Sequence, residues 1–283
     1  MSRALIVTAD DFGMSVEVNE AVEEAHRKGI LTCASLVVAG DAVDDALRRA
    51  ARMPDLGVGL HLTLYGALAS HAEPSRLAPD GVNLGESPAS TGALMMFSPR
   101  VREAARREIA AQFAAYGKTG LALGHLDGHW HCHQHPAVLA MAIEAGRTLG
   151  LRAVRLPYEP WRFSRAVAGT GNLPRLAHAL SHWPLAHMMR RQIAAAGLRT
   201  SDRFFGKTDA GFVSQALLER LAAHLPQGVT ELGLHPATST WSGPHAPPPG
   251  WAQAEELAAL TSPRVRAALD TAGIRLIRWS DLP

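Results

Sequence analysis

The chain has 283 residues, a length that fits either two small domains or one large α/β barrel. Hydrophobic residues make up 47% of it and charged residues 19%, which excludes a disordered chain and predicts a globular protein with a sizeable core. The net charge is only +2 with histidine neutral, so the chain lacks the basic excess that nucleic-acid binding requires.

The cysteines and the N-terminus indicate the compartment. Cys33 and Cys132 are too few and too far apart for a disulfide scaffold or a cysteine-rich zinc site. The N-terminus turns acidic at Asp10, before a secretion signal could form, and no run of about 18 apolar residues follows that would span a membrane. We therefore expect a cytoplasmic protein.

Strand-like and helix-like segments alternate along the chain. Apolar runs without a helical period predict strands over 4–9, 31–38, 57–64, 121–126, 151–156, 202–205, 229–234 and 274–279. Helical periodicity and end signals predict helices over 16–28, from Asp41 to about 52, 99–116, from Pro136 onward, 172–197, 214–224 and 263–272. Ser15 and Asp41 are the expected N-caps of the first and second helices, and Pro184 is expected to interrupt the segment 172–197.

This alternation predicts a parallel sheet with helical connections. No linker rich in Gly, Ser or charge divides the chain, so we expect one domain over residues 1–283, folded as a distorted or incomplete (β/α) barrel. A doubly wound open sheet is the alternative. Residues 65–98 are rich in Gly, Pro, Ser and Ala and too long for a plain connector, so we expect a lid-like or partly mobile insertion there.

Polar side chains lie where predicted strands end. They are Asp10, Asp11, His61, His125, Arg155 and His235. All strands of a parallel barrel share one direction, so these ends meet at one rim, where such folds place their active sites. A lone histidine beside apolar residues is more often a hydrogen-bonded core residue, but several at one rim favour a site.

Asp10 and Asp11 are adjacent carboxylates that would repel each other in a cleft unless a cation neutralises them. One of them could instead cap the following helix, yet that role does not explain both. Neighbouring strand residues point in different directions, so one carboxylate can bind a metal while the other faces water or substrate.

Residues 125–135 (HLDGHWHCHQH) carry a polar, mostly imidazole side chain at every second position. In an extended segment these side chains would share one face, about 6.6 Å apart along the chain. One or two of them can bind a metal directly, and Asp127 can orient a ligand by hydrogen bonding. A histidine-rich tract that binds metal loosely is the plainer alternative.

Arg155 and His235 complete the candidate set. An arginine beside carboxylates can keep one of them ionised and oriented, as a general base requires, although a plain surface salt bridge is the competing interpretation. His235 can act as a general acid, because an imidazole titrates near neutral pH.

The motifs around these residues resemble a known family. Residues 8–13 (TADDFG), 59–64 (GLHLTL), the histidine-rich stretch and 234–236 (LHP) are similar to the YdjC-like carbohydrate deacetylases, over about residues 3–282. The element from Arg155 to Tyr158 is similar to an Arg-x-Pro-Tyr motif of the wider polysaccharide deacetylase group. Residues 151–155, the region of Gly206, 235–238 and 279–282 look most like the branch associated with hopanoid biosynthesis.

The resemblance implies an N-acetyl-sugar deacetylase on a distorted barrel, with one divalent metal held by an aspartate and two histidines. Carried over by position, Asp11, His61 and His125 are the ligands and Asp10 is the base, and His235 is the proton donor by analogy with the wider group. His129 and His131 remain alternatives to His125. Two imidazoles and one carboxylate suit Zn²⁺, whereas an open, Asp-rich site also accepts Mg²⁺ or Mn²⁺, so we expect Mg²⁺ or Zn²⁺.

The substrate is expected to be an acetylated amino sugar, either lipid-linked, as in an N-acetylglucosaminyl hopanoid precursor, or a soluble chitooligosaccharide. Tyr158, Trp161 and Trp241 are the expected sugar-binding aromatic residues, although aromatic side chains also anchor loops. Residues 173–191 combine Leu, Met and Trp with Arg and His, which fits either an ordinary packed helix or peripheral contact with the inner face of the membrane.

Two other functions stay open. A phosphoesterase would want a second metal and more carboxylates near His61, and a metal-binding or lipid-sugar-binding protein without turnover would have no need of Asp10. A homodimer is also left open.

Overall fold

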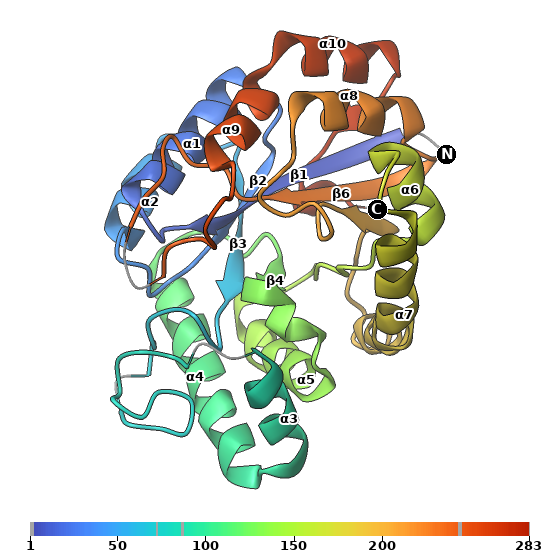
Figure 1. Cartoon of the computed structure of the whole chain (residues 1–283). Helices are drawn as coiled ribbons and strands as arrows, with labels where there is room; N and C mark the ends of the chain where they lie inside the picture. Colours follow the sequence, from blue (N-terminus) through green and yellow to red (C-terminus); the bar gives the residue numbers. More distant parts are fainter. Residues whose placement is uncertain (1–2, 72, 86–87, 243–244, 283) are drawn as a thin grey trace.

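The computed structural model describes residues 3–71, 73–85, 88–242 and 245–282 (Figure 1). Within these residues seven strands form one sheet in the order β4-β3-β2-β1-β6-β5, and β7 pairs with β1. The strands are β1 (Arg3–Phe12), β2 (Cys33–Leu36), β3 (Gly57–Leu62), β4 (Leu126–Gly128), β5 (Arg203–Phe205), β6 (Gly228–Leu234) and β7 (Arg275–Leu276). Every pairing is parallel, so all strands end at the same rim.

The central strand β1 explains the architecture. It is buried from Ala4 to Phe12, as expected of a barrel strand that packs on helices with one face and fills the barrel interior with the other. Its register with β6 runs from Arg3 opposite Gly228 to Ala9 opposite Leu234. This pairing brings the chain after Ala9 beside the chain after Leu234, so the residues that follow both strands share one edge.

Helices surround the curled sheet in Figure 1. They are α1 (Val16–Lys28), α2 (Val43–Ala50), α3 (Pro88–Phe97), α4 (Pro99–Lys118), α5 (Pro136–Gly146), α6 (Trp161–Ala168), α7 (Asn172–Ala195), α8 (Gln215–His224), α9 (Gln253–Thr261) and α10 (Pro263–Thr271), with short 3₁₀ turns η1 (His129–Gln134), η2 (Arg147–Leu149) and η3 (Trp279–Asp281). Among the described residues, none of the helices reaches the length and apolarity that a bilayer crossing needs.

The barrel is incomplete, as expected. Between β4 and β5 the expected strand over 151–156 is reduced to two isolated parallel bridges, Val154 with Leu126 and Ala153 with Arg199. Pro157 lacks an N–H for a ladder, so the chain leaves the sheet directly after Leu156. The prediction of a distorted α/β barrel in one domain is confirmed, with single bridges in place of a full strand on this side.

Several helix predictions hold and three need correction. Ser15 caps α1 through its Oγ, which accepts a hydrogen bond from the backbone N of Val18 at 3.2 Å, and α1 ends before Gly29. Asp41 does not cap α2, which begins at Val43 without a side-chain cap. Pro184 does not interrupt α7, because an exposed helix face tolerates one missing hydrogen bond. Helices α3, α6 and α9 were not predicted.

Residues 65–98 are anchored in part. Leu77, Leu84 and Met95 are buried, and Glu108 on α4 accepts hydrogen bonds from the backbone N of Ser70 at 2.8 Å and of His71 at 2.9 Å. Residues 72, 86 and 87 lie outside the described residues. The lid function of the segment stays a prediction.

Candidate active site

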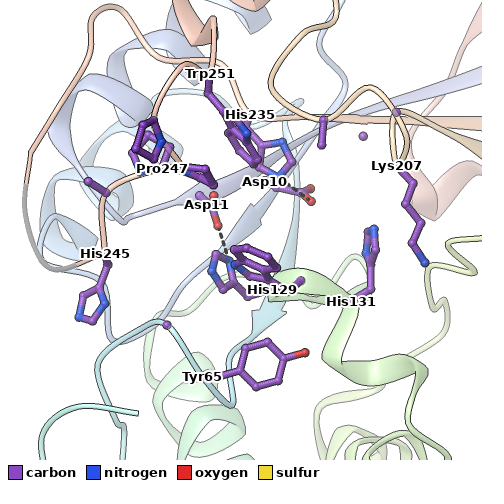
Figure 2. Close-up of a pocket in the computed structure, with 18 of the residues that line it drawn as sticks. Asp10, Asp11, Tyr65, His129, His131, Lys207, His235, His245, Pro247 and Trp251 are labelled. Atoms are coloured by element: carbon purple, nitrogen blue, oxygen red, sulfur yellow. Dashed lines mark hydrogen bonds and ion pairs between the residues drawn. The ribbon is translucent and has the colours of Figure 1, made fainter. Parts of the chain in front are cut away.

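A cavity of about 600 Å³ opens at the rim where the strands end. Figure 2 shows Asp10 and Asp11 from β1, His129 after β4 and His235 after β6 facing this cavity. The structure thus brings together side chains from three strand ends that are far apart in the sequence. Lys207, after β5, lines the opposite side.

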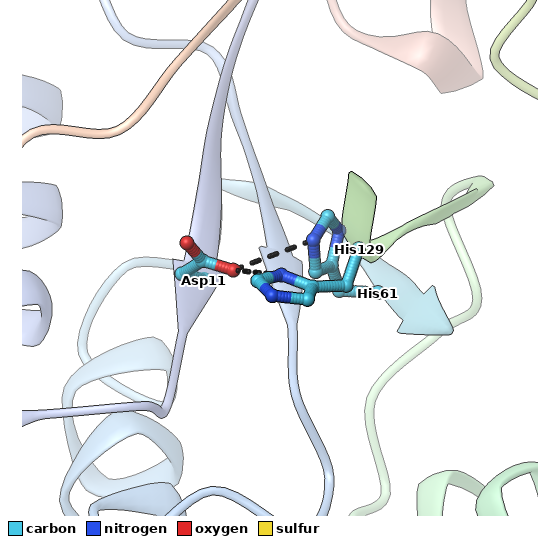
Figure 3. Close-up of side chains that lie close together, drawn as sticks. All are labelled: Asp11, His61 and His129. Carbon is cyan, nitrogen blue, oxygen red and sulfur yellow. Dashed lines mark hydrogen bonds and ion pairs between the residues drawn. The ribbon is translucent and has the colours of Figure 1, made fainter. Parts of the chain in front are cut away.

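Asp11, His61 and His129 form the tightest cluster at this rim. The Oδ1 atom of Asp11 lies 3.0 Å from Nδ1 of His129 and 3.4 Å from Nε2 of His61. Figure 3 shows both imidazoles directed at the same carboxylate oxygen. One ligand atom from each residue lies within 4.8 Å of the others, and ligand atoms in tetrahedral coordination at about 2.0–2.1 Å lie about 3.3 Å apart.

The backbone of Asp11 supports this placement. Its φ is 63°, in the left-handed region that non-glycine residues seldom adopt, and aspartate is among the residues that tolerate it best. Such conformations cost about 1–3 kcal/mol and persist where the surrounding structure imposes them, often at functional sites. The irregular end of β1 therefore points the Asp11 carboxylate into the cavity at an energetic cost.

Asp127 fixes the orientation of His61. Nδ1 of His61 lies 2.8 Å from Oδ1 of Asp127, so the ring donates its Nδ1 proton there and presents Nε2 toward Asp11. Burial alone would raise the pKa of Asp127, but Arg155 and His61 hold it well below its usual value. Burial likewise opposes the charge on His61, yet Asp127 and Asp11 raise its pKa to about 10. This environment is strongly favourable to a cation.

Asp10 is held by Arg155, which is fully buried. Nη1 and Nη2 of Arg155 donate to the two carboxylate oxygens of Asp10 at 2.7 and 2.8 Å, and its Nε donates to Glu231 at 2.8 Å. A bidentate pair of this kind fixes the plane of the carboxylate. Asp10 also lies within ligand distance of His61 and Asp127, but arginine occupies both of its oxygens.

His235 lies beside Asp10. Its Nε2 is 3.8 Å from Oδ2 of Asp10, and its ring packs against Trp251 with centroids 4.7 Å apart. Burial lowers the pKa of His235, against the opposing effect of Asp10. Glu256 accepts a hydrogen bond from the backbone N of His235 at 2.6 Å and so fixes the loop after β6.

His125 lies outside the cluster of Asp11, His61 and His129, contrary to the position expected from the resemblance. Its Nε2 lies 3.0 Å from Oγ of Ser35 and its ring stacks on Trp279 with centroids 5.1 Å apart. The ring also covers Gly59, where an added Cβ would lie 2.4 Å from it. His125 precedes Asp127 by two residues and therefore lies one layer below the rim, whereas His129 follows Asp127 by two and reaches it.

The other histidines of the stretch separate because the chain bends. Trp130 and His131 have left-handed φ values of 48° and 56° in η1. His131 lines the cavity, His133 lies 3.1 Å from the backbone O of Arg155, and the side chain of His135 caps α5. The common face expected of an extended segment does not form.

Of the three expected sugar-binding aromatic residues, only Trp241 lines the cavity. Tyr158 packs against the core, and the Trp161 ring lies under the guanidinium of Arg165. The lining instead contains Tyr65, Trp130 and Trp251. The sequence did not single out these aromatic residues, which lie in loops.

Lys207 is a functional candidate that the sequence did not reveal. Its Nζ donates to Oε1 of Gln134 at 2.9 Å, and burial lowers its pKa to about 7. Gly206 before it has a φ of 105°, and a Cβ there would lie 2.1 Å from the backbone O of Gly233. This close approach of the two strand ends aims Lys207 at the cavity.

Comparison with known proteins identifies the family. The profile of the family described as YdjC-like protein matches residues 4–271. The chain belongs to the YdjC-like family. The resemblance seen in the motifs is thereby confirmed at the family level, while the hopanoid branch stays a prediction.

The curated relatives of this YdjC-like chain have related names. A carbohydrate deacetylase of Mus musculus is 32% identical over 98% of this chain and 94% of its own length. A carbohydrate deacetylase of Geobacillus stearothermophilus is 32% identical over 99% and 98%. A chitooligosaccharide deacetylase of Serratia marcescens is 28% identical over the whole of both chains. A crystal structure of a putative cellobiose-phosphate cleavage protein of Enterococcus faecalis shares the fold, with a TM-score of 0.70, 22% identity and 99% and 98% coverage.

Proposed function

We propose that this YdjC-like protein hydrolyses the N-acetyl group of an amino sugar with the help of one divalent metal ion. The chain is a carbohydrate deacetylase, a hydrolase of a linear amide, like its relatives. The observation that carries the mechanism is the placement of the Asp11, His61 and His129 cluster beside Asp10, whose carboxylate Arg155 orients.

The donor set fits a divalent metal. Asp11 offers a carboxylate oxygen, His61 offers Nε2 and His129 offers Nδ1, and only three protein ligands leave room for water and substrate. Two imidazoles favour Zn²⁺, while Mg²⁺ accepts the same carboxylate in a hydrated site. When bound, the ion supplies Lewis acidity at this point of the cavity. Asp127 keeps His61 in the tautomer that such binding needs.

Asp10 is the general base in this proposal. It takes a proton from the water that attacks the acetamide carbonyl, and the double hydrogen bond from Arg155 keeps its carboxylate oriented for that step. His235 is the proton donor. Since its Nε2 lies 3.8 Å from Asp10, it is placed to deliver a proton to the amine as the C–N bond breaks. Acetate and a free amino sugar are the products.

The residues that line the cavity suggest how the sugar of the substrate is bound. Trp130, Trp241 and Tyr65 offer ring faces in the cavity wall on which a sugar ring can stack, and Lys207 offers a hydrogen-bond donor. We assign an N-acetylglucosaminyl lipid, such as a hopanoid precursor, as the substrate. A soluble chitooligosaccharide is the second candidate, which the name of the Serratia marcescens relative favours.

The experiment measures acetate release from lipid-linked and soluble N-acetylglucosaminyl compounds, with and without a chelator. We expect the chelator to abolish release and a divalent metal to restore it. Full activity in the chelator would overturn the metal requirement, and no release from any member of the panel would leave a binding protein without turnover. Faster release from the soluble compounds would select the second substrate.

A further inference from the structure

Helix α7 exposes an apolar stripe. Leu173, Leu180, Trp183 and Met188 are exposed to 78%, 65%, 56% and 40%. At about 100° per residue these four lie within one side of the helix. The opposite side carries the buried residues Ala179, Ala186, Met189 and Ile193, which pack on the protein. The helix therefore meets its packing requirement with one face and leaves a second apolar face uncovered.

The sequence around this stripe carries basic but no acidic residues. No Asp or Glu occurs between Glu159 and Asp202, a segment that holds six arginines. Five of these are exposed: Arg162, Arg165, Arg190, Arg191 and Arg199. The rest of the chain holds 22 of its 28 basic residues and all 26 of its acidic residues, so it is net negative. This segment, in contrast, is strongly positive. The segment that carries the exposed apolar stripe is therefore positively charged.

Helix α7 also forms part of the wall of the active-site cavity. His178, on the side of the helix away from the stripe, lines the cavity. So does Trp130, which is 60% exposed and belongs to η1, a turn in contact with α7. The helix that carries the stripe is therefore also a helix of the active site.

We propose that α7 docks on an anionic phospholipid bilayer, with its apolar stripe among the lipid headgroups and its arginines on the phosphates. Apolar burial plus attraction to anionic lipid is the way in which surface-bound helices hold a membrane. The benefit to the enzyme rests on the proposed lipid-linked substrate, whose sugar would enter the cavity from the membrane surface.

A second copy of the chain fits this surface less well. A symmetric dimer through the stripe would place the same surface against itself. Arginines would then face arginines, and the segment has no carboxylate to neutralise them. The charge pattern thus favours a partner that carries negative charge at its surface and offers an apolar interior, as an anionic bilayer does.

The test is co-sedimentation of the full chain with vesicles of phosphatidylcholine alone or of equimolar phosphatidylcholine and phosphatidylglycerol. We expect binding to the anionic vesicles that weakens with added salt. The double variant Leu180→Ser, Trp183→Ser should lower the partition coefficient at least about tenfold. Arg190→Glu with Arg191→Glu should abolish the preference for phosphatidylglycerol. The matched control Phe97→Ser removes an 82% exposed apolar side chain from α3 and should change nothing.

Three results would overturn the docking proposal: no wild-type binding to anionic vesicles, equal binding by the Leu180 and Trp183 double variant, or equal loss in the Phe97→Ser control. Light scattering adds a fourth, in which the double variant converts a dimer to a monomer without any effect on vesicles. Acetate release from a soluble N-acetyl oligosaccharide should be unchanged in the double variant. Vesicle binding without acetate release from any substrate would instead refute the proposed function and leave the docking intact.

Discussion

The end of β1 and the turn after β4 place site residues in different ways. At β1 the position of Asp10 follows from a continuous ladder with β6, so Asp10 and His235 meet by register alone. Strand β4 itself has only three residues. The η1 turn that follows it bends through two residues with left-handed φ values before the next helix begins. A strand pattern in the sequence can therefore predict where a residue in a regular ladder will lie. It cannot predict where a residue in an irregular turn will lie.

The largest expected effect separates His129 from His125. His129→Ala should lower metal affinity and acetate release by at least about a hundredfold, because it removes an imidazole from the Asp11 cluster. His125→Ala should keep the metal but lose about 2–4 kcal/mol of unfolding free energy, since it opens a cavity beneath Trp279. Metal titration by calorimetry and urea unfolding measure the two quantities. Loss of metal in His125→Ala with retention in His129→Ala would reverse our assignment.

The next effect tests the β1 end alone. Asp10→Asn should bind metal as the wild type does and lose about 10²–10⁴-fold in kcat, because the amide cannot accept the proton. Asp11→Ala should lose both metal and activity. Metal content and single-turnover acetate release report the difference. Equal kcat in wild type and Asp10→Asn would remove the base assignment.

A smaller effect belongs to Asp127, which links the two regions. Asp127→Asn should weaken metal binding about 10–100-fold, because His61 loses the acceptor that fixes its tautomer. Asp80→Asn, which alters an exposed loop carboxylate in 65–98, is the control for a neutralised charge and should leave metal affinity unchanged. An Asp127→Asn protein with wild-type metal affinity would show that His61 is oriented by packing alone.

The smallest effect concerns the loop after β6. Burial raises the pKa of Glu256 to about 7 from an ordinary 4.5. The folded state thus holds this proton more tightly than the unfolded state, and the associated stability is present at acidic pH and lost as pH rises through about 7. Glu256→Gln should flatten this part of the dependence of unfolding free energy on pH, while costing about 1 kcal/mol for one lost hydrogen bond. Urea unfolding across this pH range checks it, and an unchanged slope would contradict the expected titration.

The sequence was sufficient where local rules govern the structure. The alternation of apolar runs and helices predicted a parallel barrel, and Asp10, Asp11, His61 and His235 lie at one rim because their strands share a direction. The place of His129 in the Asp11 and His61 cluster was open at that stage. It depends on where β4 starts and ends, and a histidine at every second position suits several registers equally well.

Other site features depend on tertiary contacts that leave little trace in the sequence. Lys207 is a single lysine in a loop, and only the contact of Gly206 with Gly233 reveals its direction. Tyr158 and Trp161 follow a recognisable motif, yet core packing and the Arg165 contact take them away from the cavity. The bridges at Ala153 and Val154 likewise depend on partners remote in the chain.

One nitrogen of the Arg155 guanidinium contacts two carboxylates of the site. Nη1 of Arg155 lies 2.7 Å from Asp10 and 2.8 Å from Asp127, so the proposed base and the group that orients His61 are tied to the same atom. A substitution of Arg155 would disturb both carboxylates at once. In the proposed mechanism, proton transfer and ion binding would therefore change together.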